Sequence, residues 1–335
     1  MERPTSQKMP ATFDVVVPCY RYGHFLNQCV HSVLDQEGVV VRVLVIDDAS
    51  PDNSAAVARG LAEADSRVTV IEHRQNKGHI ATYNEGLARA RGDFVVLLSA
   101  DDYLLPGALQ RAAVLMGAHP QAGLLFGNAF AHFDDGAMEA MNSMPHLQED
   151  TILSSADFLA ACCGRNVVTT PTAVVRTALQ HEVGYYDPTL PHSGDMEMWL
   201  RLAARGSVGF IHAPQAVYRR HRQNMSLAYD DTMLPDILQR EAAIRAFIAR
   251  SDGWLADSAD MQAKMLAALA REAAHCASAA FNRADTSLGR QLAMTARRLS
   301  PQVVSTREWK RLALKRSVGP VWPAIHRLRQ LLPQR

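Results

Sequence analysis

The first 110 residues alternate between two spacings of apolar side chains, and this alternation constrains the fold more than any other feature. Short apolar runs, typical of buried strands, are followed by segments whose apolar residues recur every three or four positions, as in helices. The runs are 13–17, 39–46, 67–71 and 94–98, and the helical segments between them are 25–34, 56–64 and 82–90. Units of this length predict an α/β fold with a mainly parallel sheet covered on both faces.

Further along the chain the pattern becomes less regular and then wholly helical. Two more strands are expected at 122–126 and 208–211, and an amphipathic helix is expected to begin near Asp195. Beyond about residue 232 the sequence is rich in alanine with helical spacing. The clearest helical segments there are 238–249, 261–281 and 288–299. We therefore expect an α/β domain over residues 12–230 and a helical C-terminal region over residues 232–335.

Composition and charge exclude several classes of protein. The formal net charge is +1 over 335 residues, so the whole-chain balance predicts no nucleic-acid partner. The five cysteines are odd in number and contain no C-x-x-C pair, which favours a reducing compartment over a disulfide framework. The N-terminus lacks the apolar core of a signal peptide, and no run is long enough for a spanning helix. These features predict a cytoplasmic protein.

The last 29 residues differ from the rest in charge. Residues 307–335 hold eight Lys and Arg side chains against Glu308 alone, interleaved with Trp, Leu and Ile. A basic amphipathic segment of this kind can lie on the anionic inner face of a membrane. The alternative is the charged outer face of a helical appendage that packs on the rest of the chain, and the sequence leaves both interpretations open.

Acidic residues follow two of the expected strands directly. Asp48 comes after the second strand, and Asp101 and Asp102 come after the fourth. In parallel sheets, ligands bind beyond the carboxyl ends of the strands. Adjacent carboxylates suit a hard divalent ion that keeps positions free for phosphate, and a single carboxylate can accept a hydrogen bond from a base or a ribose. Asp101 and Asp102 could instead serve only as a turn or helix cap, and the segment that follows Asp48 could be only a helix start.

Two more residues are candidates for chemistry. Asp195 stands at the head of the expected amphipathic helix, where a carboxylate can act as a general base or simply as an N-cap. His221 lies in a basic stretch with Arg219, Arg220 and Arg222. It can ligate a metal beside arginines that screen a diphosphate, or form a structural hydrogen bond.

Taken together and in order, six short segments resemble the family 2 glycosyltransferases of the GT-A fold. The resemblance covers about residues 12–226. The segments are 15–20, 45–52, 76–78 with 83–86, 90–93 leading to 99–102, 194–201 and 218–221.

The resemblance implies a nucleotide site on the first half of the sheet. Pro18 and Tyr20 would form the lip of the base pocket, with Tyr20 stacking on the base. Asp48 would bond the base, and Lys77 and Gly78 would approach the nucleotide.

The resemblance also implies a metal and a base. Asp101 would meet the ribose or the metal, and Asp102 would bind a Mn²⁺ or Mg²⁺ ion that bridges the diphosphate. His221 would complete the metal or phosphate site. Asp195 would be the catalytic base, which implies inversion at the anomeric carbon.

The expected function is sugar transfer from a nucleotide diphosphate donor, with uridine as the expected base, to an acceptor hydroxyl. The acceptor would be a glycan or a lipid-linked glycan in surface polysaccharide or lipopolysaccharide synthesis. One alternative is a sugar nucleotidyltransferase, which would need a Gly-rich phosphate loop that residues 17–23 do not supply. Another is a non-catalytic nucleotide-sugar-binding module on the same fold.

Overall fold

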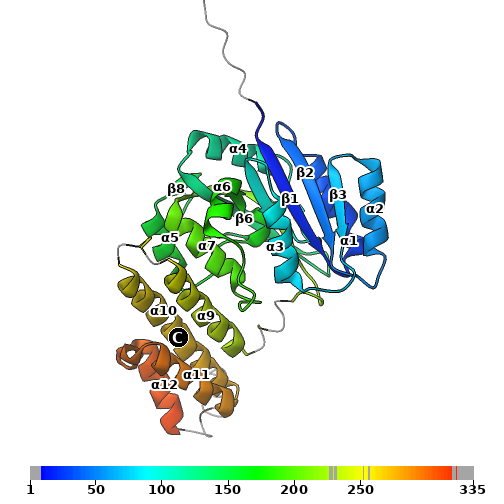
Figure 1. Ribbon diagram of the computed structural model, residues 1–335. Coiled ribbons are helices and arrows are strands. Elements are labelled where there is room, and N and C mark those ends of the chain that lie inside the picture. Colours follow the sequence, from blue (N-terminus) through cyan, green and yellow to red (C-terminus); the bar gives the residue numbers. More distant parts are fainter. Residues whose placement is uncertain are drawn as a thin grey trace, which may run out of the picture. The chain divides into compact units, whose positions relative to one another are not determined.

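The computed structural model describes residues 9–225, 229, 232–251, 253–255, 257–318 and 322 (Figure 1). The chain divides into two compact units. The first consists of residues 1–159, 167–191 and 198–222, and the second of 160–166, 192–197 and 223–335. The second unit therefore takes in two short segments from the first 200 residues as well as the C-terminal region.

The first unit contains all the strands of the described residues. They are β1 (Thr12–Cys19), β2 (Val40–Asp47), β3 (Val68–Glu72), β4 (Phe94–Leu97), β5 (Tyr103–Leu104), β6 (Ala122–Phe133), β7 (Met138–Met141), β8 (Thr151–Leu153), β9 (Val174–Arg176) and β10 (Ser207–Arg220). Its helices are α1 (Gly23–Leu34), α2 (Ser54–Ala64), α3 (His79–Arg89), α4 (Ala108–Ala118) and α6 (Thr177–Val183), with a 3₁₀ turn at Thr170–Thr172. Helices α5 (Ser155–Cys162) and α7 (Gly194–Arg205) have residues in both units.

The strands form one sheet in the order β3-β2-β1-β4-β9-β6-β10-β5, with β7 beside β6 and β8 beside β10. β3, β2, β1 and β4 run parallel to one another, and β6 runs parallel to β10. The short strand β9 runs antiparallel between β4 and β6. The expected mainly parallel sheet is confirmed.

Alternate residues of the first strand serve the two faces of the sheet. Val15 and Val17 belong to the buried core that includes residues of α1, α2 and α4. Val16 faces α3, where a Cβ on Gly86 would lie only 2.2 Å from a methyl carbon of Val16. Figure 1 shows α3 lying across β1. Gly86 thus lets α3 approach the sheet closely. The loop that precedes α3 therefore lies at the edge of the sheet.

The second unit is helical in its C-terminal part. It contains α9 (Leu234–Arg250), α10 (Ser258–Asn282), α11 (Thr286–Leu299), a 3₁₀ turn (Pro301–Ser305) and α12 (Arg307–Val318). Buried alanines along α10, from Ala270 to Ala280, let the other helices pack closely against it. No helix in the described part of the chain combines the length and apolar character needed to cross a bilayer.

Only part of the basic segment 307–335 is described, namely α12 and Trp322; the rest of that expectation lies outside the described residues. Leu312 of α12 is fully buried. Lys315 donates hydrogen bonds to Ser278 and Asn282 of α10. The described portion of the segment therefore packs on α10 by one face.

Candidate active site

Most of the predicted site residues lie along one edge of the sheet, at the carboxyl ends of β1, β2 and β4. The N–H of Asp48 donates to the carbonyl of Cys19 (2.9 Å), and the N–H of Ala100 donates to the carbonyl of Pro18 (3.3 Å). The segments that carry Pro18, Tyr20, Asp48 and Asp101 therefore start side by side. Tyr20 is 41% exposed, as expected for a ring available to stack on a ligand.

The backbone at this edge is held in an unfavourable conformation at two positions. Arg21 and Ala49, just beyond β1 and β2, have φ values of 66° and 58°. This left-handed region is disfavoured for residues with a Cβ and persists where the surroundings enforce it, as at binding sites. The N–H of Arg21 donates to Ser50 Oγ (3.0 Å), which ties the two turns together.

Asp48, which the sequence assigns to the nucleotide base, is buried and organises the loop that contains Lys77 and Gly78. Its Oδ1 accepts from the Lys77 N–H (2.8 Å), and its Oδ2 accepts from the Gly78 N–H (2.9 Å). His73 Nδ1 lies 2.7 Å from Asp48 Oδ1. Burial alone would raise the pKa of Asp48, but these hydrogen bonds outweigh it and hold the pKa below its usual value. Asp48, Lys77 and Gly78 are thus brought together in one hydrogen-bonded cluster.

Gly78 has a specific conformational role in this cluster. It stands immediately before α3 with φ of 84°, a conformation that L side chains rarely adopt. Any other residue there would strain the turn that aims the Gly78 N–H at Asp48.

The second group of predicted residues forms because β5 pairs with the end of β10. Tyr103 pairs with Val217, so the Asp101–Asp102 turn lies beside Arg219 and His221. His221 Nε2 is 3.1 Å from Asp101 Oδ2, and both side chains are 8% exposed. The His221 ring stacks on Phe25 at 5.3 Å between centroids. The fold therefore brings Asp101 and His221 into contact, although they are 120 residues apart in sequence.

Asp102 lies deeper than Asp101. Its Oδ1 accepts from the backbone N–H of Arg219 (2.9 Å), and the residue is 2% exposed. Burial, and then the neighbouring charge of Asp101, raise the pKa of Asp102 well above its usual value. The carboxylate is thus buried with the Arg219 N–H as a donor and a like charge beside it, an arrangement that a cation would relieve.

Arg219, Tyr22 and Phe25 belong to this site but were not singled out from the sequence as site residues. The guanidinium of Arg219 bonds the carbonyl of Asp101 and Gln28, and lies over the rings of Phe25 and Tyr103. Burial and the charges of Asp101 and Asp102 raise the pKa of Tyr22. A sequence signal existed only for Arg219, which lies two residues before His221.

A divalent ion fits the Asp101–His221 pair. Mg²⁺ binds oxygen ligands at about 2.1 Å in octahedral geometry, which puts neighbouring ligands about 3 Å apart, and it keeps positions for water and phosphate. His221 Nε2 and Asp101 Oδ2, which contact each other at 3.1 Å, lie close enough together to share such an ion. Among the described residues, no cluster of three or more His, Cys, Asp or Glu side chains could hold a metal.

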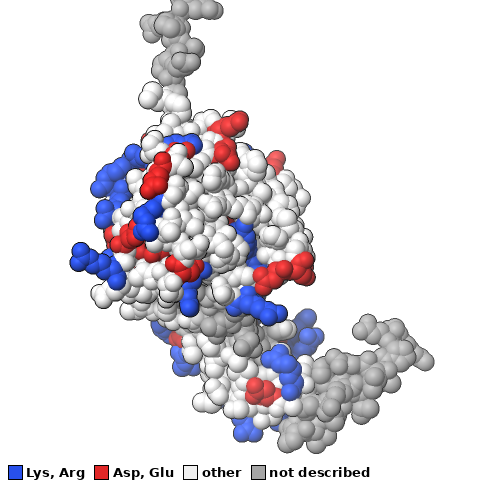
Figure 2. All heavy atoms as spheres, turned by 90° about the vertical axis from the view of Figure 1, so that its right-hand side faces the viewer, with Lys and Arg blue, Asp and Glu red and all other residues white. Residues whose placement is uncertain are grey.

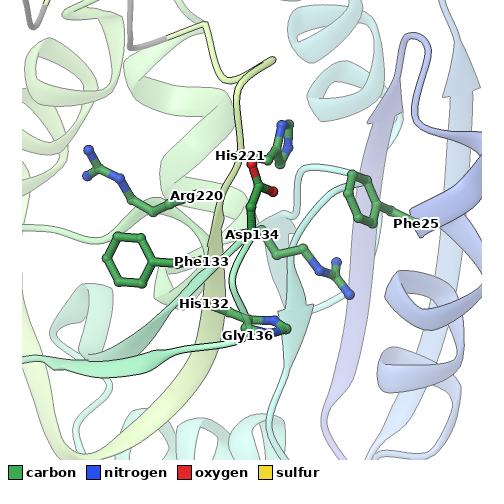
Figure 3. Close-up of a pocket in the computed structure, with 8 residues that line it drawn as sticks. Phe25, His132, Phe133, Asp134, Gly136, Arg220 and His221 are labelled. Carbon is green, nitrogen blue, oxygen red and sulfur yellow. The ribbon is translucent and has the colours of Figure 1, made fainter.

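A pocket of about 190 Å³ adjoins His221 (Figure 3). Its lining residues are Phe25, His132, Phe133, Asp134, Gly136, Arg219, Arg220 and His221. Figure 3 shows Phe25 approaching from the α1 side, the others coming from β6, the turn that follows it and the end of β10, and the Arg220 guanidinium pointing away. The pocket is open and small, with room for a sugar-sized group next to His221.

Asp195 lies in the first turn of α7, in the short segment that belongs to the second unit. Other residues of that segment are fixed by α9 of the same unit. His192 Nε2 is 3.1 Å from Asp236 Oδ1, and Arg250 Nη1 is 3.5 Å from Oε1 of the fully buried Glu197. The structure thus shows how the segment is held within its own unit.

Comparison with known proteins agrees with this architecture. Residues 14–163 match the family model described as glycosyl transferase family 2. A relative from Campylobacter jejuni, named GalNAc(5)-diNAcBac-PP-undecaprenol beta-1,3-glucosyltransferase, is 26% identical over 212 residues, which is 63% of this chain and 65% of that protein. Matches of this kind span less than two thirds of the relatives' own length.

Two solved structures share the fold. TarS 1–349 from S. aureus, in complex with UDP-GlcNAc, has a TM-score of 0.69 at 16% identity and covers 97% of this chain and 93% of its own. The mannosyltransferase PcManGT from Pyrobaculum calidifontis, in complex with GDP-Man and Mn²⁺, has a TM-score of 0.51 at 18% identity and covers 93% and 88%. Residues 14–163 are therefore similar to glycosyl transferase family 2, and the chain has the GT-A glycosyltransferase fold.

Proposed function

We propose that this protein is an inverting glycosyltransferase that moves a sugar from a nucleotide diphosphate donor, a UDP-sugar, to an acceptor hydroxyl. The observation that carries the proposal is the Asp101–His221 pair beside a buried Asp102, at the sheet edge that also holds Asp48. The TarS complex with UDP-GlcNAc supports UDP as the nucleotide.

The nucleotide would be held by the first group of residues. Pro18 and Tyr20 border the base, and the exposed Tyr20 ring stacks on it. The Asp48 carboxylate has room for a further donor, because a carboxylate offers about four acceptor positions and His73, Lys77 and Gly78 use three of them. Lys77 and Gly78 place their backbone beside it. Together these residues would fix the anomeric carbon in position.

The diphosphate would lie at the second group. Asp101 and His221 would hold Mn²⁺ or Mg²⁺, and Asp102 would act from behind them by fixing the backbone of Arg219. When bound, the ion supplies positive charge for the leaving diphosphate. The PcManGT complex with Mn²⁺ supports a divalent ion in this fold.

The chemical step would use Asp195 as a general base. The carboxylate takes the proton from the acceptor hydroxyl as that oxygen bonds the anomeric carbon. The bond from carbon to the diphosphate oxygen breaks on the opposite face, and the nucleoside diphosphate leaves with the bond electrons. A lipid-linked glycan is the proposed acceptor, supported by the undecaprenol-linked substrate in the name of the Campylobacter relative.

The experiment that tests this function is a transfer assay with a panel of UDP-sugars and Mn²⁺, comparing wild type with Asp195→Asn. The variant should bind UDP as tightly as wild type in calorimetry and lose transfer by roughly 10²- to 10⁴-fold, the usual contribution of a general base. Undiminished turnover in Asp195→Asn would remove Asp195 from the mechanism. Formation of UTP and a sugar 1-phosphate when pyrophosphate is added to the UDP-sugar would instead indicate a nucleotidyltransferase.

We further propose that α12 contacts an anionic membrane face, where a lipid-linked acceptor would reside. Arg307, Lys310 and Arg311 are exposed, and Leu314 beside them is 55% exposed. Figure 2 shows Lys and Arg side chains spread over the described helical unit with few acidic ones between them. Such a face is attracted to anionic lipid.

The membrane proposal is tested by sedimentation with phosphatidylglycerol vesicles. Reversing charge at Lys310 and Arg311, as K310E/R311E, should reduce sedimentation strongly. The control K264E changes an exposed lysine on α10 of the same unit and should reduce it less. Equal sedimentation of K310E/R311E and wild type would refute the membrane contact.

A further inference from the structure

His73 lies between two carboxylates that come from different elements. It follows β3 directly, and its N–H donates to the carbonyl of Asp47 (2.9 Å). Its Nδ1 is 2.7 Å from Asp48 Oδ1, and its Nε2 is 3.0 Å from Glu85 Oε2 on α3. The His73 side chain is only 2% exposed. Both ring nitrogens are therefore committed to carboxylates inside the protein.

The two carboxylates accept hydrogen bonds on their other sides as well. Lys77 Nζ lies 2.9 Å from the same Glu85 oxygen, and this contact is the main reason why the pKa of Glu85 is lowered to about 2. Asp48 accepts the N–H groups of Lys77 and Gly78. Both carboxylates are therefore ionised acceptors, and His73 satisfies both only when each of its nitrogens carries a proton. The buried His73 ring bridges the end of β2 to α3.

We propose that His73 is a positioning residue for the nucleotide site. By holding the Asp48 carboxylate from one side, it fixes that carboxylate where the backbone of Lys77 and Gly78 can donate to it, and so sets the shape of the loop that receives the base. The inference rests on the proposed function for the identity of the ligand, whereas the effect on the loop follows from the contacts alone.

His73 makes two separate contacts, one to Asp48 and one to Glu85, and substitutions can remove either contact alone. The amide nitrogen of asparagine approximates the place of histidine Nδ1, and that of glutamine approximates Nε2. His73→Asn therefore keeps a donor for Asp48 and loses Glu85, whereas His73→Gln keeps a donor for Glu85 and loses Asp48. His73→Ala loses both.

In transfer assays, His73→Gln and His73→Ala should raise KM for the UDP-sugar about tenfold or more, with kcat changed less than about twofold. Losing a hydrogen bond to a charged group is worth roughly that factor, and a change in KM alone marks lost binding. His73→Asn should recover most of the affinity. Arg89→Ala is the matched control, because it removes another partner of Glu85 at the exposed end of α3 and should leave KM unchanged.

Amide hydrogen exchange of Lys77 and Gly78 tests the positioning without any substrate. Exchange at both should be faster in His73→Gln than in His73→Asn, and unchanged in Arg89→Ala. Wild-type exchange rates and KM in a folded His73→Gln protein would overturn the proposal. Absence of transfer by wild type with every donor would refute the proposed function instead, and the exchange result would still decide the role of His73.

Discussion

Two Asp–Asp pairs end two parallel strands at the same edge of the sheet, and their surroundings are opposite. Asp48, after β2, is surrounded by donors: His73 and the N–H groups of Lys77 and Gly78. Asp102, after β4, is equally buried, but it has Asp101 beside it and accepts from the backbone N–H of Arg219. The pKa of Asp48 is lowered, whereas that of Asp102 is raised.

These different surroundings determine what each pair is suited to bind. The charge of Asp48 is already compensated within the protein, so this carboxylate is fit for orienting a neutral group such as a base. Burial and the neighbouring charge of Asp101 raise the pKa of Asp102, so a cation from outside gains most there. One sequence pattern thus produces an ordered loop after one strand and the proposed cation site after another.

The largest expected effect comes from neutralising the well-compensated carboxylate. Asp48→Asn should lower the free energy of unfolding by about 2–3 kcal/mol, since charged hydrogen bonds from His73 and the 77–78 backbone are weakened inside the protein. Urea denaturation measures this. Glu63→Gln, an exposed carboxylate on α2, is the control and should change stability little. An unchanged urea midpoint for Asp48→Asn would show that these donors do not stabilise the charge of Asp48.

At the Asp101–Asp102 pair, the change in the free energy of unfolding should not have the sign expected for Asp48→Asn. Asp102→Asn, measured in a metal chelator, should leave the free energy of unfolding unchanged or raise it, by about 1.4 kcal/mol for each unit by which the pKa of Asp102 is raised in the folded state. The amide oxygen still accepts from the Arg219 N–H, while burial and Asp101 no longer oppose a charge. Destabilisation of Asp102→Asn as large as that of Asp48→Asn would contradict the difference that we assign to the surroundings of the two carboxylates.

The smallest effect concerns pH. The pKa of Glu85 is lowered to about 2 from an ordinary 4.5, chiefly by Lys77, so the folded state binds the proton more weakly than the unfolded chain. Its stabilising contribution is complete above about pH 4.5 and is lost as pH falls toward 2. Glu85→Gln should therefore be destabilised relative to wild type at pH 6 but much less at pH 2, as measured by urea midpoints. A constant difference across that range would show that the charge of Glu85 is not involved.

The sequence predicted the parts of the fold that depend on local pattern. The β-branched runs that end in Asp47 and near Ser99 placed β2 and β4 to within a residue or two, because buried parallel strands are continuously apolar. Asp48, Asp101 and Asp102 were found because they follow such runs. The strands β6 and β10 extend well past the apolar runs at 122–126 and 208–211, because they pair with each other through polar residues such as Asn128 and His132.

Features that depend on distant pairing were not visible. The antiparallel pairing of Tyr103 with Val217 is what brings Arg219 onto Asp102, and no local pattern predicts a partner more than 100 residues away. His73 was missed for a similar reason, since its two carboxylate partners are 25 and 12 residues distant. The grouping of the Asp195 segment with the helical unit was also unforeseen.

The most direct test of the central claim is a calorimetric titration of UDP into the protein with and without Mn²⁺, repeated with Asp101→Asn. We expect Mn²⁺ to tighten UDP binding to the wild type by at least about tenfold. Asp101→Asn should retain only the weaker, metal-independent binding that the Asp48 loop provides. UDP binding that is equally tight with and without Mn²⁺ in the wild type, or a metal effect that survives in Asp101→Asn, would contradict the assignment of a cation to the end of β4.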